Sequence, residues 1–253
     1  MPEPLRVQRT VAARQVAHGT SHQSVERALA VLSAFDDVRV ELGVGELSRI
    51  CGLHKSTVSR LAATLERAGF LRRAGERYRL GMEPLRLGAV AVASFDPLSA
   101  TRPAMERLSA LSGETVNLAV PDGDAVLNVA EIPGTFILSA SDGWTGRRTA
   151  PHAAANGKVL LAFGALALRP DAPLERYTER TITDRRLLEA ELERTRERGY
   201  AIAVSELEIG LAAAAAPVFD GEGRCVAAIS VSGPEVRLGP EDLDRLGRLA
   251  AGD

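Results

Sequence analysis

The segment HKSTVSRLAATLERAGFLRRAGERYRLG, residues 54–81, constrains the fold of the 253-residue chain more than any other stretch. Its first half repeats apolar residues at helical spacing, and Gly69 then ends the pattern. The residues of this apolar face are Val58, Leu61, Ala62 and Leu65. Two short strand patterns, FLRR and RYRL, follow on either side of a turn that contains Gly75. The segment therefore predicts a helix over residues 55–68 and then a small, arginine-rich hairpin.

Two shorter helical patterns precede this segment. In SVERALAVLSAF, four apolar residues share one face, and Ser24 is predicted to be the N-cap. These four are Val25, Ala28, Leu29 and Leu32. In VGELSRIC, residues 44–51, the predicted inward side consists of Leu47, Ile50 and Cys51, and Gly52 ends the helix. Three helices followed by a two-stranded hairpin predict a winged helix-turn-helix domain over residues 23–82.

The third helix carries small hydroxyl and basic side chains on the face opposite its apolar stripe. Short side chains allow a helix to lie deep in the major groove of double-stranded DNA, where arginine binds base edges or phosphates. We expect the backbone amides around Lys55 and Ser56 to be free to meet a phosphate. The alternative, a three-helix packing unit with a solvated charged face, is disfavoured by the basic hairpin. The predicted DNA-binding residues are Lys55, Ser56, Thr57, Ser59, Arg60, Arg67, Arg72, Arg73 and Arg77.

Charge is distributed unevenly along the chain. Residues 1–95 contain 14 Lys and Arg against 9 Asp and Glu, whereas the remainder contains 17 against 24. This asymmetry indicates that the front part meets a polyanion. We expect residues 1–22 to form a mobile tail, whose arginines either touch that polyanion or are solvated. Without a signal peptide, a bilayer-spanning apolar run or metal-ligand spacing around Cys51 and Cys225, we expect a cytoplasmic protein with reduced thiols and no membrane partner.

The rest of the chain predicts an α+β domain, residues 97–253, reached through a linker helix, residues 83–96. The linker helix has an apolar stripe that packs either on its own chain or on a partner chain: Leu85, Leu87, Val90 and Val92. A longer helix follows Asp96-Pro97 and ends at Ser112. The strand patterns are TVNLAV, AVLNVAEI, FILSAS, YAIAVS, LAAAAAPVFD and RCVAAISVSG. The helical patterns are APHAAANGKVLLAF and DRRLLEAELERTRERG, the latter with Leu187, Leu188, Leu192 and Thr195 inward. This succession of strand and helix patterns predicts a mostly antiparallel sheet with helices on either side.

Together these stretches resemble the IclR-type bacterial transcriptional regulators. SVERALAVLSAF, VGELSRICGLHKSTVSRLAATLERAGFL and YRLG are similar to the DNA-binding domain of that family. PHAAANGKVLLAF, TITDRRLLEAELERTRERGYAI and AAPVFDGEGRCVAAISVSGP are similar, in the same order, to signature stretches of its ligand-binding domain. The resemblance implies a homodimer or homotetramer that binds promoter DNA, as repressor or activator, and responds to a small metabolite in a GAF-like or PAS-like effector domain.

The resemblance also places the effector site. It implies contacts from the loop before the GK helix, here Trp144, Gly146 and Arg147, and from the positions of Ala203, Ala213, Ser230 and Ser232. Ala203 and Ala213 stand where the family often has a polar residue and a cysteine, so we expect a more apolar pocket that binds an aromatic or otherwise bulky organic acid.

The two serines lie on one face of a strand, where they either bind a carboxylate together or are satisfied within the sheet. Two alternatives stay open for the loop. Either Trp144 closes over a ligand ring and Arg147 binds the acid group of the ligand, or the loop is a solvated surface. Lys158 is expected to serve helix packing or an ion pair.

Two other classes of protein are weighed against a ligand-responsive regulator. An enzyme with an accessory DNA-binding domain is disfavoured, because the sequence has no Gly-x-Ser-x-Gly elbow, no phosphate-binding glycine loop and no metal spacing among its four histidines. We therefore expect no cofactor and no metal. A structural DNA-binding protein without an effector is disfavoured by the intact pair Ser230 and Ser232.

Overall fold

The computed structural model describes residues 23–36, 38–93, 96–136 and 143–252. These residues form two compact units, one on either side of residues 94 and 95, and each unit is described by itself. Among the described residues, no helix is long and apolar enough to cross a membrane. The predicted tail, residues 1–22, and most of the predicted strand FILSAS lie outside the described residues.

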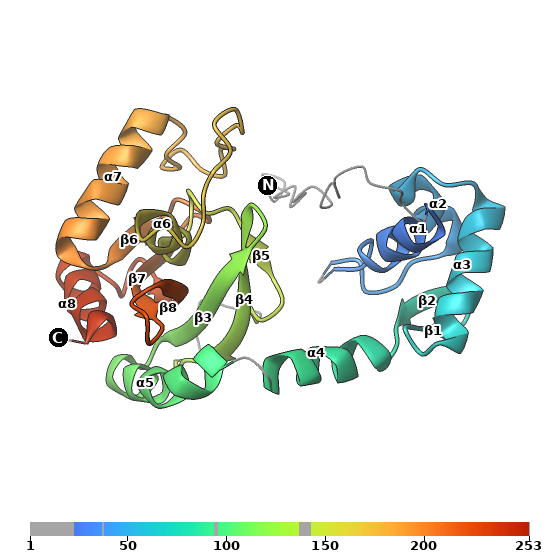
Figure 1. The fold of residues 1–253 in the computed structure, drawn as a ribbon, viewed down its shortest axis with the longest axis horizontal. Coiled ribbons are helices and arrows are strands. Elements are labelled where there is room, and N and C mark those ends of the chain that lie inside the picture. The colour runs from blue at the N-terminus through green and yellow to red at the C-terminus, as the bar shows by residue number, and fades with distance from the viewer. Residues whose placement is uncertain (1–22, 37, 94–95, 137–142, 253) are drawn as a thin grey trace. The chain divides into compact units, whose positions relative to one another are not determined.

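The N-terminal unit is a winged helix-turn-helix followed by one further helix (Figure 1). Its helices are α1 (Gln23–Leu32), α2 (Val44–Cys51), α3 (Lys55–Arg67) and α4 (Glu83–Ala93). The wing consists of the antiparallel strands β1 (Leu71–Ala74) and β2 (Arg77–Leu80). The predicted arrangement of three helices and a basic hairpin is confirmed.

A small core holds this unit together and fixes the wing on the helices. The core residues include Val31, Leu47, Val58, Ala62, Leu71 and Tyr78. Tyr78 of the wing exchanges two backbone hydrogen bonds with Leu42, at 2.9 and 3.0 Å, and its ring is almost fully buried. Because these bonds join the wing to the segment before α2, the wing cannot swing away without breaking a backbone pair and exposing an aromatic ring.

Three details of the first two helices differ from the prediction. Ser24 lies inside α1, which begins at Gln23, so Ser24 is not the N-cap. Val25 and Leu29 are 56% and 55% exposed, because α1 packs on the core through Val31 on its other side. Ile50 of α2 is likewise exposed, and Leu47 alone of that helix is buried. A unit this small cannot cover every apolar face of its helices.

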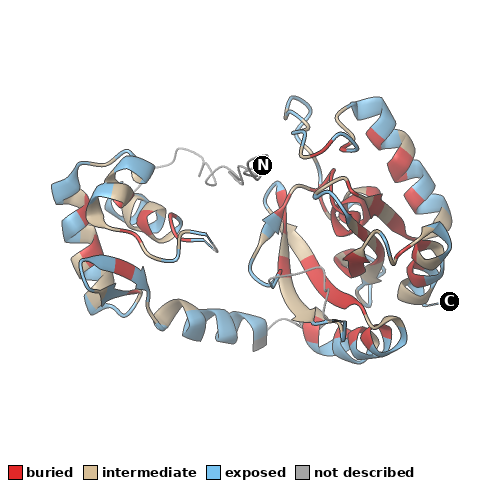
Figure 2. Ribbon diagram, turned by 180° about the vertical axis from the view of Figure 1, so that it is seen from behind, coloured by how far each residue is buried: buried red, intermediate tan, exposed pale blue. Residues whose placement is uncertain are grey.

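Helix α4 also exposes its apolar stripe (Figure 2). Leu85, Leu87, Val90 and Val92 are all classed as exposed in the single chain. The stripe is therefore not packed within the N-terminal unit. An apolar stripe of this length on one helix is typical of a surface that another chain covers.

The C-terminal unit contains a six-stranded antiparallel sheet in the order β5-β4-β3-β8-β7-β6. Its strands are β3 (Thr115–Asp122), β4 (Ala125–Ile132), β5 (Arg148–Thr149), β6 (Ala201–Val204), β7 (Leu211–Phe219) and β8 (Cys225–Pro234). Its helices are α5 (Asp96–Ser112), α6 (Ala155–Ala162), α7 (Arg185–Arg198) and α8 (Pro240–Ala251).

Side chains of the strands alternate between two apolar layers, apart from Val129 and Ala130 of β4, which both pack on the first layer at a register shift. One layer packs under α5 and α8 and includes Val116, Leu118, Ala214, Ile229 and Val231. The other packs under α6 and includes Ala119, Val126, Ala203, Ala215 and Ala228. Because side chains alternate along a strand, Asn117, Ser230 and Ser232 fall on the α6 face of the sheet. The predicted antiparallel sheet with helices on either side is confirmed.

The structure contains elements that the sequence did not predict. The two-residue strand β5 lies in a stretch expected to be a loop, and α8 follows the last predicted strand. In α7, Leu188, Leu192 and Thr195 are buried as expected, but Leu187 is exposed. The buried side of that helix runs through Glu191 instead, whose carboxylate binds Arg194 and Arg198 at 2.8 Å each. This follows the helical period, since residues three and four apart share a face.

Candidate functional site

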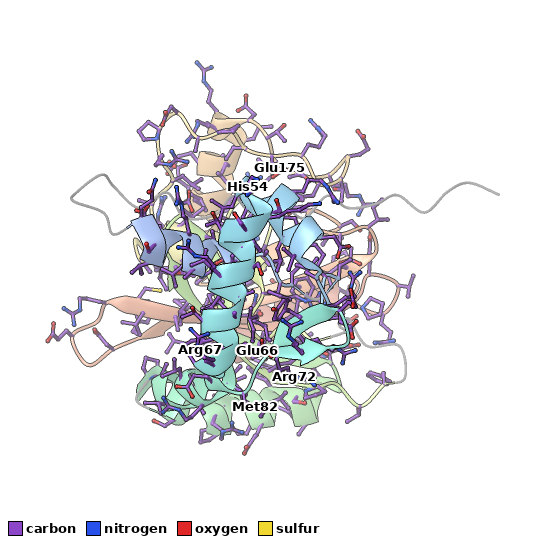
Figure 3. All side chains as sticks on the ribbon, turned by 90° about the vertical axis from the view of Figure 1, so that its right-hand side faces the viewer. His54, Glu66, Arg67, Arg72, Met82 and Glu175 are labelled. Atoms are coloured by element: carbon purple, nitrogen blue, oxygen red, sulfur yellow. The ribbon has the colours of Figure 1, made fainter. Side chains whose placement is uncertain are left out.

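The first site is the exposed face of α3 (Figure 3), where labels mark His54 at its beginning and Glu66 and Arg67 at its end. His54 is the N-cap, and its Nδ1 accepts a hydrogen bond from the amide of Ser56 at 3.4 Å and lies 2.8 Å from the Ser56 hydroxyl. The prediction that the Ser56 amide is free is therefore wrong. Along the helix, Lys55, Ser56, Ser59, Arg60 and Arg67 are exposed, and Thr57 is half-buried.

The basic side chains of α3 and the wing differ in whether they have a hydrogen-bond or ion-pair partner. Arg67 donates to the hydroxyl of Thr64 at 3.2 Å. Lys55, Arg60 and Arg72 have no hydrogen-bond or ion-pair partner in the part of the chain that the structure describes. An unpaired cation on a helix that is otherwise lined by short hydroxyl side chains is available to bind an anionic surface.

The remaining arginines of the wing bind acidic groups of the same unit. Arg73 lies 3.4 Å from a carboxylate oxygen of Glu66 and donates to the hydroxyl of Tyr78 at 2.9 Å. Arg77 binds Glu46 at 2.7 Å, and Arg79 binds Glu41. The pKa of Glu46 is lowered, first by a hydrogen bond from the Gly43 amide and then by Arg77. These ion pairs tie the wing to the start of α2, so Arg72 is the wing cation left without a partner among the described residues.

The second site is a cavity of about 50 Å³ between the sheet and the start of α6. Residues from all six strands or their adjoining segments line it: Asn117, Asn128, Trp144, Thr149, Ala153, Ala154, Ala155, Asn156, Ala203, Glu206, Leu207, Leu211, Ala213, Ser230 and Ser232. The structure therefore brings together five of the seven predicted effector residues. Nearly half of the lining residues are polar.

Hydroxyl and amide groups face this cavity from adjacent strands. Ser230 of β8 lies directly opposite Asn117 of β3, and Ser232 lies opposite Thr115. The Asn117 side-chain amide donates to the Ser232 hydroxyl at 3.4 Å. The hydroxyl of Ser230 has no hydrogen-bond partner among the described residues and is not satisfied within the sheet.

Three buried polar atoms at this cavity also have no hydrogen-bond partner in the described parts of the chain. They are Asn117 Oδ1, Thr149 Oγ1 and Glu206 Oε2. Asn117 and Thr149 are only 4% and 5% exposed. Buried polar atoms are nearly always hydrogen-bonded in folded proteins, and an unsatisfied one is destabilising. Three of them around one cavity indicate a site for a polar ligand.

Helix α6 points its first turn at the same cavity. Its N-cap, Ala154, has no side chain that could accept from the first amides, although the Gly157 amide donates to Asn156 Oδ1 at 2.8 Å. Ala154, Ala155 and Asn156 all line the cavity. The positive end of a helix favours an anionic group placed against it. This end of the cavity is therefore suited to an acid group, although no arginine or lysine lines it.

Lys158 forms a buried ion pair behind the cavity wall. Its Nζ lies 2.6 Å from Glu206 Oε1 and donates to the Ile202 carbonyl at 3.0 Å, and its side chain is 1% exposed. Burial raises the pKa of Glu206, although the Lys158 charge acts in the opposite direction. The expected ion-pair role of Lys158 is confirmed.

The loop before α6 contributes less than expected. Trp144 is buried and lines the cavity, and its amide donates to the Glu131 carboxylate at 2.7 Å. Gly146 and Arg147 do not line the cavity. Gly146 instead completes a turn with a φ of 84°, and its amide donates to the Asn128 carbonyl at 2.7 Å. The Arg147 guanidinium lies 5.5 Å from the centre of the Trp144 ring.

His152 lies near the cavity wall but does not line it. It is buried, and its Nε2 donates to the Glu175 carbonyl at 2.9 Å. Burial lowers the pKa of His152. Among the described residues, no group of three or more His, Cys, Asp and Glu side chains could hold a metal ion.

Sequence reasoning missed five polar residues of the cavity: Asn117, Asn128, Thr149, Asn156 and Glu206. A signal was present for the first two, since each is the single amide in an otherwise apolar strand pattern. A buried amide in a strand needs a partner, and this predicts a polar site on that face. Thr149 and Glu206 lie in short or irregular segments and gave no comparable signal.

A winged helix-turn-helix joined to an α+β domain, with a cavity between sheet and helix that several polar side chains line, defines a class of DNA-binding proteins that respond to a small ligand. Residues 24–75 match the IclR helix-turn-helix domain, and residues 89–251 match the C-terminal domain of the bacterial transcriptional regulator IclR. The chain belongs to the IclR family of bacterial transcriptional regulators, which are regulators and not enzymes.

Individual relatives support the same assignment. The chain is 36% identical to the transcriptional regulator XynR of Escherichia coli K12, over 87% of this chain and 90% of that protein. A transcriptional regulator from Rhodococcus sp. RHA1 is 30% identical, with a TM-score of 0.76 over 91% of this chain and 95% of that one. An IclR homologue from Microbacterium hydrocarbonoxydans, solved in complex with 4-hydroxybenzoate, is 26% identical, with a TM-score of 0.74 over 90% and 96%.

Proposed function

We propose that this regulator reads double-stranded promoter DNA with α3 and the wing. The exposed face of α3 combines unpaired cations with short hydroxyl side chains, which suits insertion into the major groove. Of the predicted contacts, Lys55, Ser56, Thr57, Ser59, Arg60 and Arg67 lie on α3, and Arg72, Arg73 and Arg77 lie on the wing. Because its target is chromosomal DNA, the protein acts in the bacterial cytoplasm.

The cavity under α6 is proposed to hold the effector, a small organic acid. The observation that carries this proposal is the convergence of three unsatisfied polar atoms, the free Ser230 hydroxyl and the uncapped start of α6 on one cavity. The 4-hydroxybenzoate bound by the Microbacterium homologue supports an organic acid. An aromatic effector stays a prediction from the methyl groups of Ala203 and Ala213, and a ring would need Trp144 to move, because the cavity is only about 50 Å³.

A DNA-binding assay with a panel of organic acids tests this function. The purified protein is expected to bind DNA from its own upstream region in a sequence-preferring, salt-sensitive manner, and one class of acid is expected to change that affinity. Binding that no acid alters would contradict the effector role of the cavity. A Ser230→Ala variant is the matched control, because it should still bind DNA but respond only at higher acid concentration.

Oligomerisation through α4 is part of the same proposal. The exposed stripe of α4, with the exposed Val25 and Leu29 of α1, is proposed to be covered by a second copy of the chain. Leu85, 64% exposed, should lie within that interface. We expect Leu85→Glu to weaken dimerisation by at least about tenfold, because it places a charge in an apolar contact.

Sedimentation-velocity ultracentrifugation over a range of concentrations measures this effect. A matched control is Leu187→Glu, which places the same charge on an exposed leucine of α7. An unchanged distribution of species in Leu85→Glu would remove α4 from the interface.

A further inference from the structure

We infer that the effector carries a hydrogen-bond donor, a hydroxyl or N–H group, in addition to its acid group. This inference rests on the proposed effector role of the cavity and adds a chemical class to it. It follows from the chemical type of the unsatisfied atoms at the cavity, which are mainly hydrogen-bond acceptors. Two of the three atoms, Asn117 Oδ1 and Glu206 Oε2, accept hydrogen bonds and cannot donate one when the carboxylate is ionised.

Asn117 presents its carbonyl oxygen because its amide is already used. Its Nδ2 donates to the Ser232 hydroxyl, and its Oδ1 is buried without a partner among the described residues. A ligand carboxylate at this point would set two acceptors against each other. A ligand hydroxyl or N–H group would satisfy the oxygen with an ordinary hydrogen bond.

Glu206 imposes the same requirement at the other side of the cavity. Its Oε1 is bound by Lys158 at 2.6 Å, whereas Oε2 has no partner in the described part of the chain. Glu206 lines the cavity, and its buried Oε2 is an acceptor without a donor among the described residues. A ligand acid group is repelled here, because two carboxylates at contact distance disfavour each other's charged form.

The donors of the cavity lie elsewhere and are suited to the acid group. They are the Ser230 hydroxyl and the first amides of α6. Ser230 is the cross-strand neighbour of Asn117, so a donor for the ligand acid and an acceptor for a ligand donor lie side by side. The cavity thus offers donors for an acid group and acceptors for a ligand hydroxyl or N–H group.

Pairs of acids that differ by one or more hydroxyl groups test this inference on the unaltered, full-length protein. Suitable pairs are lactate and propionate, mandelate and phenylacetate, and gluconate and hexanoate, with binding measured by calorimetry. In the pair that fits the cavity, we expect the hydroxylated acid to bind at least about tenfold more tightly, since a site with buried acceptors rejects a ligand that leaves them unpaired.

The outcomes separate the inference from the proposed function. If a donor-free acid binds as tightly as its hydroxylated partner, the effector site stands and the inference is wrong. If no acid binds and none alters DNA binding, the proposed effector site itself is wrong and the inference falls with it.

Variants of the two acceptor residues test whether Asn117 and Glu206 cause the preference for the hydroxylated acid. Asn117→Leu removes the acceptor while keeping a similar volume, and it should reduce the preference for the hydroxylated acid by weakening that acid alone. Ser230→Ala is the matched control on the facing strand, and it should weaken both acids of a pair by a similar factor. If Asn117→Leu fails to fold, the ratio of the two affinities is measured on Glu206→Gln instead. An unchanged ratio in both acceptor variants would overturn the assignment.

Discussion

Replacing Lys158 by methionine is expected to lower the free energy of unfolding of the protein by about 3 to 5 kcal/mol at neutral pH. Methionine fills a similar volume, so the effect comes from charge. The variant leaves Glu206 in a buried position without its cation and leaves the Ile202 carbonyl without its donor. Urea denaturation followed by the fluorescence of Trp144, the only tryptophan, measures the change.

The pH dependence of this loss has a defined sign. Burial raises the pKa of Glu206 in the folded protein, so this group stabilises the fold most below its unfolded pKa and contributes less as the pH rises through its folded pKa. Removing Lys158 removes an influence that lowers this pKa. The deficit of Lys158→Met should therefore grow as the pH rises and shrink as the pH falls and the Glu206 carboxyl takes up a proton.

Two controls test the cause of the deficit. The double variant Lys158→Met/Glu206→Gln should recover much of the lost stability, because no buried charge then remains. Arg224→Met breaks an exposed ion pair with Asp220 and should change the unfolding free energy by no more than about 0.5 kcal/mol. A deficit that persists unchanged in the double variant would mean that Lys158 acts through packing and not through its charge.

Replacing Arg60 by alanine is expected to weaken binding to the specific operator by about 1 to 3 kcal/mol, or roughly fivefold to 150-fold. Arg60 lies on the exposed face of α3 and has no partner in the described part of the chain, so the variant should fold normally. An arginine at this position can donate two hydrogen bonds to one guanine in the major groove. Fluorescence anisotropy with the operator and with a random duplex of the same length measures the loss on each.

Arg72→Ala separates reading of the bases from binding of the backbone. The unpaired Arg72 of the wing is expected to bind a phosphate, so its removal should weaken operator and random DNA equally and lower the slope of log affinity against log salt by about 1. Arg102→Ala, which removes a cation from α5, is the matched control and should change neither. Equal losses on both duplexes in Arg60→Ala would make Arg60 a phosphate contact as well.

The N-terminal unit could be predicted almost fully from the sequence, because its signals are local. The apolar stripe of α3, the glycine that ends it and the turn of the wing each lie within a few residues of the element that they define. The errors concern which apolar side chains are buried, because tertiary packing determines this. Val25 and Leu29 have the spacing of core residues, but only the structure shows that the small core of this unit excludes them.

The cavity could be predicted only in part. The two serines of β8 carry a short motif on a regular strand, and both line the cavity as expected. Asn117 becomes a cavity residue because β3 pairs with β8, which is more than a hundred residues away in the chain. Local patterns do not determine such a pairing. Thr149 reaches the cavity from a strand of two residues, too short to leave a periodic pattern.

The contact between Lys158 and the Ile202 carbonyl also bears on how copies of this chain can associate. Strand β6 is the outer strand of the sheet, and an unpaired outer strand is open to strand addition from another chain. Here Lys158 binds the Ile202 carbonyl of β6. Just beyond the end of the strand, the hydroxyls of Thr178 and Thr181 donate to the carbonyls of Ser205 and Glu206, at 2.6 Å each. Side chains of the same unit thus occupy these carbonyls, which leaves fewer free acceptors at this edge for a strand of another chain.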